Sequence, residues 1–202
     1  MMIERILYPV STLGPGERLT IWTSGCSKGC PGCISPEMWQ PRPDKDIPHH
    51  QLVSFAKKII SQNQVDGITI SGGDPLEQPS ALLDFIAEVH SLCRDILIFT
   101  GYTLEEIKGI WNVEQVNRLM AHTAVLVDGK YVDGLNDGIS PLRGSTNQQV
   151  NYFDENMREK YEHYMKTKSR QVQNVYYGDM LVSVGIPNKL RRCRHGKKER
   201  YH

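Results

Sequence analysis

The sequence lacks any long hydrophobic run. No window of its 202 residues approaches the roughly 20 consecutive apolar residues of a membrane-spanning helix. Its first ten residues, MMIERILYPV, contain charges and a proline instead of the apolar core of a secretory signal peptide. We therefore expect no membrane partner and no export, and we expect the protein to be cytoplasmic.

The sequence also has few cysteines, and they are not spread out as a disulfide framework. Three of the five, Cys26, Cys30 and Cys33, are crowded into eight positions. Such crowding is typical of a metal or cluster site in a reducing compartment. Cys93 follows an apolar helical pattern and is expected to be a small buried residue, and Cys193 is expected to be a free thiol.

The chain has almost no net charge, because its formal charge at pH 7 is only +1. The segment 189–202 nevertheless has seven Lys or Arg and one Glu, which gives +6 there and leaves −5 for the rest. Such a run can bind acidic partners or nucleic acid, but terminal charged runs are more often solvated. We therefore predict one domain over residues 1–188 and a flexible basic tail over 189–202, without a nucleic-acid partner.

Strand-like and helix-like apolar patterns alternate along most of the chain. This alternation predicts right-handed βαβ units and a parallel sheet. A short strand, a helix and a hairpin are expected to follow. The expected strands are 18–24, 67–71, 95–100, 124–127 and 150–153; the expected helices are 48–63, one with its apolar stripe over 82–89, two short ones within 103–120, and 153–169; 34–48 is a loop, and the hairpin centres on 178–179.

The length limits how this sheet can close. A complete eight-fold β/α barrel typically takes about 250 residues, and the chain is shorter than that. The predicted fold class is therefore α/β: a partial, open (β/α) barrel with mainly parallel strands and a C-terminal hairpin.

The unusual short motifs all follow predicted strands. In parallel β/α folds the carboxyl ends of the strands gather at one edge, and active sites form there. We therefore expect these motifs to share one edge of the sheet. They are the cysteine array, SGGD at 71–74, TGY at 100–102 and DGK at 128–130.

The cysteine array allows three interpretations. Three thiolates on one loop can bind a 4Fe-4S cluster and leave one iron without a protein ligand. Structural zinc generally needs two pairs of Cys or His ligands, and only His49 and His50 could supplement the array. A redox role for Cys30 and Cys33 would leave Cys26 unused. The residues favour a cluster over zinc, and zinc over dithiol chemistry.

Two glycines follow the second predicted strand. Gly72 and Gly73 allow the backbone to approach another group closely, so they could grip a small polar ligand. Alternatively, they form a tight turn in which Asp74 caps a helix that begins at Pro75. The residues alone favour the second interpretation.

Polar residues of the later loops are ambiguous by themselves. Arg143 lies near Asn147 and Gln148 and suits a carboxylate or phosphate partner, although a loop arginine is usually solvated. Asp128 and Lys130 are equally open to a structural or a binding role.

Taken together, these motifs resemble the radical S-adenosylmethionine superfamily, and within it the activating proteins of anaerobic (class III) ribonucleotide reductase and the related glycyl-radical enzyme activases. The resemblance covers roughly residues 5–188. Two features depart from it: Gly32 stands where many superfamily members have an aromatic residue, and the 153–169 helix and the tail extend the compact activase pattern. The shared motifs are C-x3-C-x2-C with Pro-Gly before the last cysteine, GGDP at 72–75, FTGY at 99–102, VDG at 127–129, RGSTNQ at 143–148 and VGIP at 184–187.

The resemblance implies an iron-sulfur oxidoreductase that works under anaerobic conditions. It implies that the three crowded cysteines hold a 4Fe-4S cluster and that S-adenosylmethionine binds the open iron. Reductive cleavage of that cofactor would give a 5′-deoxyadenosyl radical, which would generate a glycyl radical on anaerobic ribonucleotide reductase or a similar enzyme. A flavodoxin-like or ferredoxin-like protein would donate the electron. The implied cofactor-binding residues are Gly72, Gly73 and Asp74 beside the methionine amino group, and Thr100, Asp128 and Arg143 beside the rest of S-adenosylmethionine.

Two other functions remain open. One is a radical enzyme that modifies a peptide or a small molecule, as a deazapurine synthase does. The other is a non-catalytic metal-binding module. The short chain favours the activase, because an unclosed sheet leaves a side open to the glycine-bearing loop of a large protein substrate.

Overall fold

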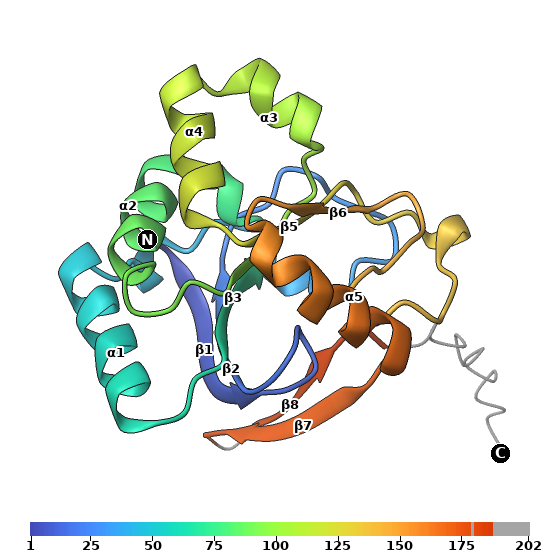
Figure 1. Cartoon of the computed structure of the whole chain (residues 1–202), viewed down its shortest axis with the longest axis horizontal. Helices are drawn as coiled ribbons and strands as arrows, with labels where there is room; N and C mark the ends of the chain where they lie inside the picture. Colours follow the sequence, from blue (N-terminus) through green and yellow to red (C-terminus); the bar gives the residue numbers. More distant parts are fainter. Residues whose placement is uncertain (179, 188–202) are drawn as a thin grey trace, which may run out of the picture.

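Four parallel strands form the centre of the sheet in the computed structural model, which describes residues 1–178 and 180–187 (Figure 1). An antiparallel strand lies at each edge, and the order is β1-β2-β3-β4-β5-β6. The central strands are β2 (Arg18–Thr23), β3 (Gly67–Gly72), β4 (Ile96–Phe99) and β5 (Val125–Asp128); the edge strands are β1 (Ile3–Val10) and β6 (Gln149–Tyr152).

Helices and a hairpin cover the two faces of this sheet. Every residue of β2 and β5 is buried, as expected for parallel strands covered on both faces. One face packs against α1 (His49–Gln62), α2 (Pro79–Val89) and α4 (Val113–His122). The other packs against α5 (Arg158–Thr167) and the hairpin of β7 (Val172–Tyr177) and β8 (Met180–Gly185) (Figure 1).

The remaining helix, α3 (Leu104–Ile110), follows β4 and begins with a capping box. In this box the Thr103 hydroxyl accepts from the Glu106 N–H, and the Glu106 carboxylate accepts from the Thr103 N–H. Among the described helices, none is long and apolar enough to span a membrane.

A buried polar cluster fastens α5 to the amino ends of the strands. The Arg18 guanidinium is fully buried and lies 3.0 Å from the Asp95 carboxylate. Tyr161 and Lys160 of α5 also donate to Asp95, at 2.5 and 2.7 Å. Burial raises the pKa of Asp95, but Arg18 and the two α5 donors outweigh it and hold that pKa below its usual value. Through Lys160 and Tyr161, this cluster joins α5 to the end of the sheet that lies opposite the predicted site.

Most of the predicted elements are confirmed, and the sheet is mainly parallel as expected. β1 was missed because it is an edge strand whose middle residues, including Glu4 and Arg5, are half-exposed and carry no clear strand pattern. The helix predicted over 153–169 is shorter, because Asp154 caps a separate 3-10 turn before α5 begins. The helical spacing of the apolar residues Leu52, Phe55 and Ala56 predicts that Phe55 faces the core, but Phe55 is 43% exposed, and Val53 is buried instead. The predicted tail, with Cys193, lies outside the described residues.

Candidate functional site

The predicted motifs lie at one edge of the sheet. β2, β3, β4 and β5 are parallel, so their carboxyl ends point the same way. The cysteine loop (residues 26–33) follows β2, and Gly72 and Asp74 mark the end of β3. Thr100 follows β4, and Asp128 ends β5. The structure therefore places these residues at one edge of the sheet, as expected.

Backbone hydrogen bonds hold the cysteine loop where it leaves β2. The Gly25 N–H donates to the Met38 carbonyl and the Cys26 N–H to the Trp39 carbonyl, both at 2.9 Å. The Asp74 N–H donates to the Gly25 carbonyl at 2.8 Å. The three loop cysteines are free thiols of intermediate exposure. The loop is therefore anchored, and its thiols are accessible.

The glycine pair after β3 lies against the chain's own backbone. A Cβ on Gly72 would lie 2.8 Å from the Trp22 carbonyl carbon, and one on Gly73 would lie 2.7 Å from the Met38 carbonyl oxygen. Gly72 also has φ of +114°, a conformation that L side chains rarely adopt. The close approach that these glycines permit is thus to the end of β2 and to the segment after the cysteine loop.

Asp74 fills the capping role predicted for it. Its carboxylate accepts from the Leu76 N–H at 3.0 Å, at the start of the 3-10 turn Pro75–Glu77. It also accepts from the Thr100 hydroxyl at 2.9 Å and the Gly101 N–H at 2.8 Å. Burial raises the pKa of Asp74 to about 6, against the opposing effect of these donors. The side chain therefore joins the end of β3 to the end of β4.

A second carboxylate, Glu77, joins the cysteine loop to the same two strand ends. The Ser27 hydroxyl donates to it at 2.5 Å and the Tyr102 hydroxyl at 3.0 Å. The Lys28 ammonium lies 3.1 Å from the centroid of the Tyr102 ring, which is a cation–π geometry. Sequence reasoning missed Glu77 and Lys28. The available signal was charge beside a motif: Lys28 lies within the cysteine array, and Glu77 follows the GGDP motif by two residues.

Asp128 and Arg143 belong to the structure of their own loops. The buried Asp128 accepts from the Leu104 N–H at 2.7 Å and from the Gln149 N–H at 3.2 Å. It therefore fixes the start of α3 and the start of β6. The half-buried Arg143 makes longer contacts, donating to the Gln148 carbonyl at 3.3 Å and the Ser140 hydroxyl at 3.4 Å.

A cavity of about 890 Å³ opens between the cysteine loop and the connection from β5 to β6 (residues 129–148, hereafter the site loop). The site loop contributes one wall, and the residues just after β8 contribute another. The walls include Cys33, Phe99, Tyr131, Leu142, Gln148 and Ile186. This cavity holds a predicted ligand residue and part of the RGSTNQ motif, so it is the candidate active site.

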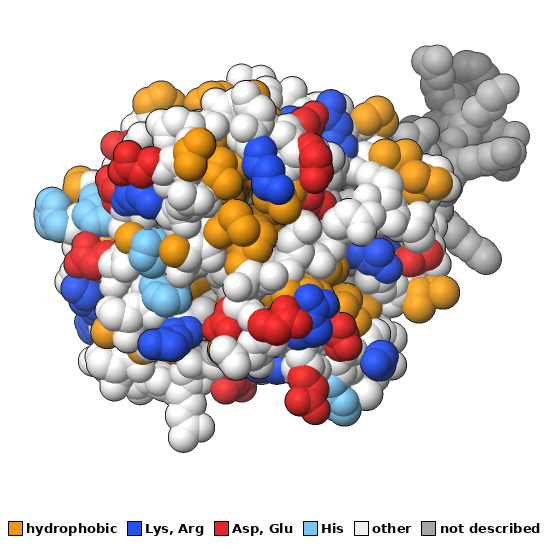
Figure 2. All heavy atoms as spheres, turned by 45° about the horizontal axis from the view of Figure 1, so that its top comes forward, with side chains coloured by type: hydrophobic (Ala, Val, Ile, Leu, Met, Phe, Trp, Pro, Cys, Tyr) orange, Lys and Arg blue, Asp and Glu red, His pale blue; other side chains and the backbone are white. Residues whose placement is uncertain are grey.

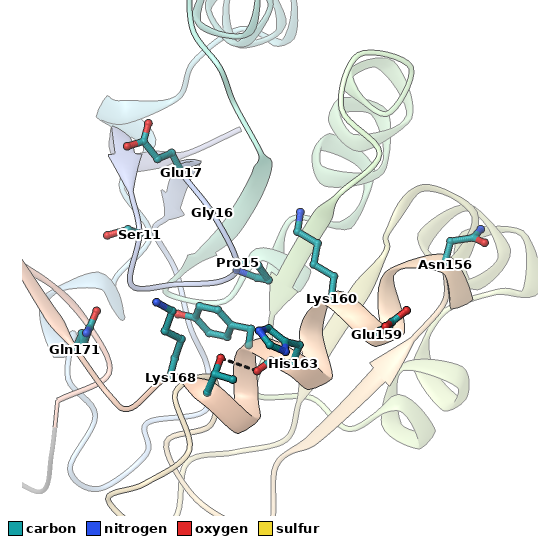
Figure 3. Close-up of a pocket in the computed structure, with 12 residues that line it drawn as sticks. Ser11, Pro15, Gly16, Glu17, Asn156, Glu159, Lys160, His163, Lys168 and Gln171 are labelled. Atoms are coloured by element: carbon teal, nitrogen blue, oxygen red, sulfur yellow. Dashed lines mark hydrogen bonds between the residues drawn. The ribbon is translucent and has the colours of Figure 1, made fainter.

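A groove of about 990 Å³ lies at the other end of the sheet, between the β1–β2 turn and α5 (Figure 3). Lys160 and Lys168 line it, together with Glu17 and Glu159, so both signs of charge border it. No predicted site residue borders it. The groove is therefore not the candidate active site, although its volume is somewhat larger than that of the cavity beside the cysteine loop.

The residues of the cysteine loop fit a cluster with one open iron. They offer three thiols on an anchored loop at the edge of a cavity. Burial raises the pKa of Cys26, although the amides of Lys28 and Gly29 oppose this effect. Within the described ranges, no three His, Cys, Asp or Glu side chains are grouped to hold a single metal ion. Cys26, Cys30 and Cys33 would hold the cluster, and an amino acid group could complete it.

Comparison with known proteins agrees with this chemistry. A family model described as a 4Fe-4S single cluster domain matches residues 12–151. Proteins named anaerobic ribonucleoside-triphosphate reductase-activating protein, from Salmonella typhi and Escherichia coli (strain K12), are each 35% identical over 154 residues, covering 72% of this chain and 96% of theirs. The protein of that name from Enterobacteria phage T4 is 30% identical over 156 residues, covering 74% of this chain and 93% of its own.

A solved structure, that of QueE from Escherichia coli, covers 50% of this chain and 52% of its own, with a TM-score of 0.42 and 17% sequence identity. It is a partial likeness and carries no functional conclusion.

These findings decide among the three interpretations of the cysteine array in favour of a 4Fe-4S cluster, over zinc and over a redox dithiol. The family match includes the cysteine loop and the RGSTNQ motif, and the relatives align over nearly their whole length. The chain belongs to the radical S-adenosylmethionine family of anaerobic ribonucleoside-triphosphate reductase-activating proteins, enzymes with a 4Fe-4S cluster.

Proposed function

We propose that this protein generates a glycyl radical on an anaerobic ribonucleotide reductase. The observation that carries the proposal is the cavity of about 890 Å³, with Cys33 on one side and the site loop on the other. A cofactor bound at the cysteine loop would face a space large enough for a segment of another protein. We assign the activity to the single domain predicted over residues 1–188.

The proposed cofactor site combines the cysteine loop with the three neighbouring strand ends. The three loop cysteines would hold the cluster, and S-adenosylmethionine would complete its coordination. When bound, this pair supplies the one-electron cleavage and hydrogen abstraction that the reaction requires. Gly72 and Gly73 would present backbone to the amino group of the cofactor, and Asp74 and Thr100 hold that backbone in place.

Arg143 and Asp128 have different proposed roles. Arg143 is half-buried and its own contacts are long, so its guanidinium can turn toward a carboxylate or hydroxyl of the cofactor. Asp128 is engaged by two backbone N–H groups and acts by placing the loops around the site.

Apolar side chains form part of the wall of the cavity. Phe99, Leu142, Ile186 and Pro187 present hydrocarbon surface to it. A reactive radical needs such a surrounding, because water and mobile polar groups would divert it. The chain's contribution to the chemistry is therefore to place the cofactor and exclude solvent.

Two observations support a protein as the substrate. The sheet ends in β1 and β6 and is not closed into a barrel by the strands described. Exposed apolar side chains also lie directly after the cysteine loop and on the site loop: Ile34 is 57% exposed, Leu135 45% and Ile139 73%. Figure 2 shows hydrophobic side chains interspersed with both signs of charge on the face that it brings forward. A flavodoxin-like or ferredoxin-like protein completes the proposal as electron donor.

The test is electron paramagnetic resonance on anaerobically reduced, cluster-loaded protein mixed with S-adenosylmethionine and an anaerobic ribonucleotide reductase. A glycyl radical signal is expected, and Cys33→Ser should abolish it while Cys93→Ser preserves it. Cofactor cleavage without a glycyl radical on several reductases would instead indicate an enzyme that modifies a small molecule or a peptide. Colourless protein with zinc alone after anaerobic reconstitution would indicate a metal-binding module.

A further inference from the structure

Arg170 is a buried arginine that belongs to none of the recognised motifs. It lies between α5 and β7, is 8% exposed, and follows the last residue matched by the family model, residue 151. All three of its guanidinium nitrogens donate hydrogen bonds. The acceptors are the carbonyls of Ser140 (2.9 Å), Arg143 (2.7 Å), Gly144 (3.2 Å) and Pro187 (3.2 Å), and the side chains of Asn136 (2.7 Å) and Asp137 (3.1 Å).

Five of these six acceptors belong to the site loop. Residues 136–144 of that loop form neither helix nor strand, so the carbonyls there have no regular ladder of partners. A planar guanidinium with five N–H groups can satisfy several acceptors in fixed directions, which an ammonium cannot do. Arg170 thus replaces, with one side chain, the hydrogen bonds that secondary structure would otherwise provide.

The contacts continue from Arg170 to the cavity. The Asn136 amide, whose oxygen accepts from Arg170, donates to the Tyr131 hydroxyl at 3.1 Å. The Tyr131 ring lies close to two glycines, since a Cβ on Gly144 would be 2.9 Å from it and one on Gly32 would be 3.2 Å away. Gly32 belongs to the cysteine loop and Gly144 to the site loop. The ring therefore sets the separation of the two loops that form the cavity.

The sixth acceptor reaches the remaining wall. This acceptor is the carbonyl of Pro187, the last described residue after β8. Ile186 and Pro187 both line the cavity. One guanidinium consequently contacts the site loop and the C-terminal wall together. Asp137 provides the opposite charge at 3.1 Å and is 25% exposed, so the arginine is buried with a partner.

We propose that Arg170 is the positioning residue of this site: it holds the site loop against the cysteine loop, so that the cavity is formed before a ligand enters. The inference about loop order stands on these contacts alone, and its consequence for cofactor affinity rests on the proposed function. If only a fraction of molecules has the formed cavity, the apparent dissociation constant rises by the inverse of that fraction.

The first experiment measures loop order in the cluster-free protein. Arg170→Gln and Arg170→Lys are compared with the wild type by hydrogen exchange and mass spectrometry. Peptides within 129–148 should exchange about tenfold faster in both variants, while peptides of β2 to β5 keep their protection, because a local opening is involved. Arg158→Gln is the matched control: it removes an arginine of α5 that is 43% exposed and pairs with Glu155 and Glu162.

The second experiment separates positioning from direct contact. S-adenosylmethionine binding to the cluster-loaded Arg170→Gln variant should weaken about tenfold. The electron paramagnetic resonance spectrum of the reduced cluster at saturating S-adenosylmethionine should match the wild type, because the bound arrangement is the same. Guanidinium ion at millimolar concentration should restore loop protection and affinity to an Arg170→Ala variant, and ammonium ion should not.

Two results would overturn the proposal. One is unchanged exchange in the site loop of both Arg170 variants. The other is an equal loss of protection across the whole sheet, which would make Arg170 a general stability residue. Neither measurement needs the reductase, so a failure of the proposed substrate would leave this test intact, and a failure here would leave the glycyl radical assay intact.

Discussion

Asp74 is a carboxylate whose charge destabilises the fold while its shape organises the site. Burial raises its pKa from 3.8 to about 6, although the Gly101 and Leu76 amides and the Thr100 hydroxyl donate to it. A difference of about 2 pKa units corresponds to about 3 kcal/mol between the two protonation states. Because the folded-state pKa is raised, protonation of Asp74 stabilises the folded protein. This contribution is fully present below pH 3.8 and is lost as the pH rises through about 6.

The perturbation is Asp74→Asn, which keeps the shape and removes the titration. We expect the free energy of unfolding of the variant to rise relative to that of the wild type as the pH rises, by about 3 kcal/mol between pH ~3.5 and pH ~8. Activity should nevertheless fall. The two carboxylate oxygens accept from Leu76 and Gly101 separately, and the amino group of an asparagine would have to face one of these N–H donors.

The assay is urea unfolding of the cluster-free protein, with its thiols reduced, from pH ~3.5 to pH ~8. Asp84→Asn is the control, because Asp84 is a 56% exposed carboxylate on α2 in a surface pair with Arg118. Its difference from the wild type should be small at every pH. A free-energy difference for Asp74→Asn that stays constant with pH, or that moves against the variant as the pH rises, would refute the reasoning.

Three further predictions concern the cysteine loop, the glycine turn and the buried ion pair. Serine at any one of the three loop cysteines should abolish the visible absorption of the reconstituted cluster, whereas Cys93→Ser, in the hydrophobic core, should keep it. Gly73→Ala should lower the free energy of unfolding in urea by about 1–3 kcal/mol, because its Cβ would collide with the Gly25 carbonyl; an unchanged unfolding midpoint would contradict this. Asp95→Asn should lower the free energy of unfolding by about 3–5 kcal/mol near neutral pH, because Arg18 loses its buried partner. That loss should shrink in acid, where the lowered pKa of Asp95 means that the wild type also gives up the pair; a loss that is equally large in acid would argue against it.

The order of strands and helices was predictable because the apolar periodicity is local. The strand ends could then be aligned on one edge, since parallel β/α units leave only that arrangement. β1 could not be predicted in the same way, because its pairing with β2 depends on a partner and not on its own half-exposed pattern. The helix expected over 153–169 was too long because a local cap at Asp154 outweighs periodicity.

Several site contacts join residues that are far apart in the chain. Ser27 donates to Glu77 across 50 positions, and Arg170 donates to Asn136 across 34. Neither pair has a characteristic spacing, so no pattern in the sequence singles out these residues. The importance of Arg170 and of the Tyr131 ring follows from burial and contact alone.

By itself, the sequence determined the position of the cysteine loop and favoured a cluster there, because three thiols at a spacing of four and three residues are a local property of the chain. It also predicted the motifs that align with the strand ends. Only the tertiary structure decided what the glycine turn touches. The parallel register pairs Thr23 of β2 with Gly72 of β3, so the turn meets the chain's own backbone. Only the fold, likewise, carries Arg170 from beyond α5 to the site loop, because a long-range contact has no local signature.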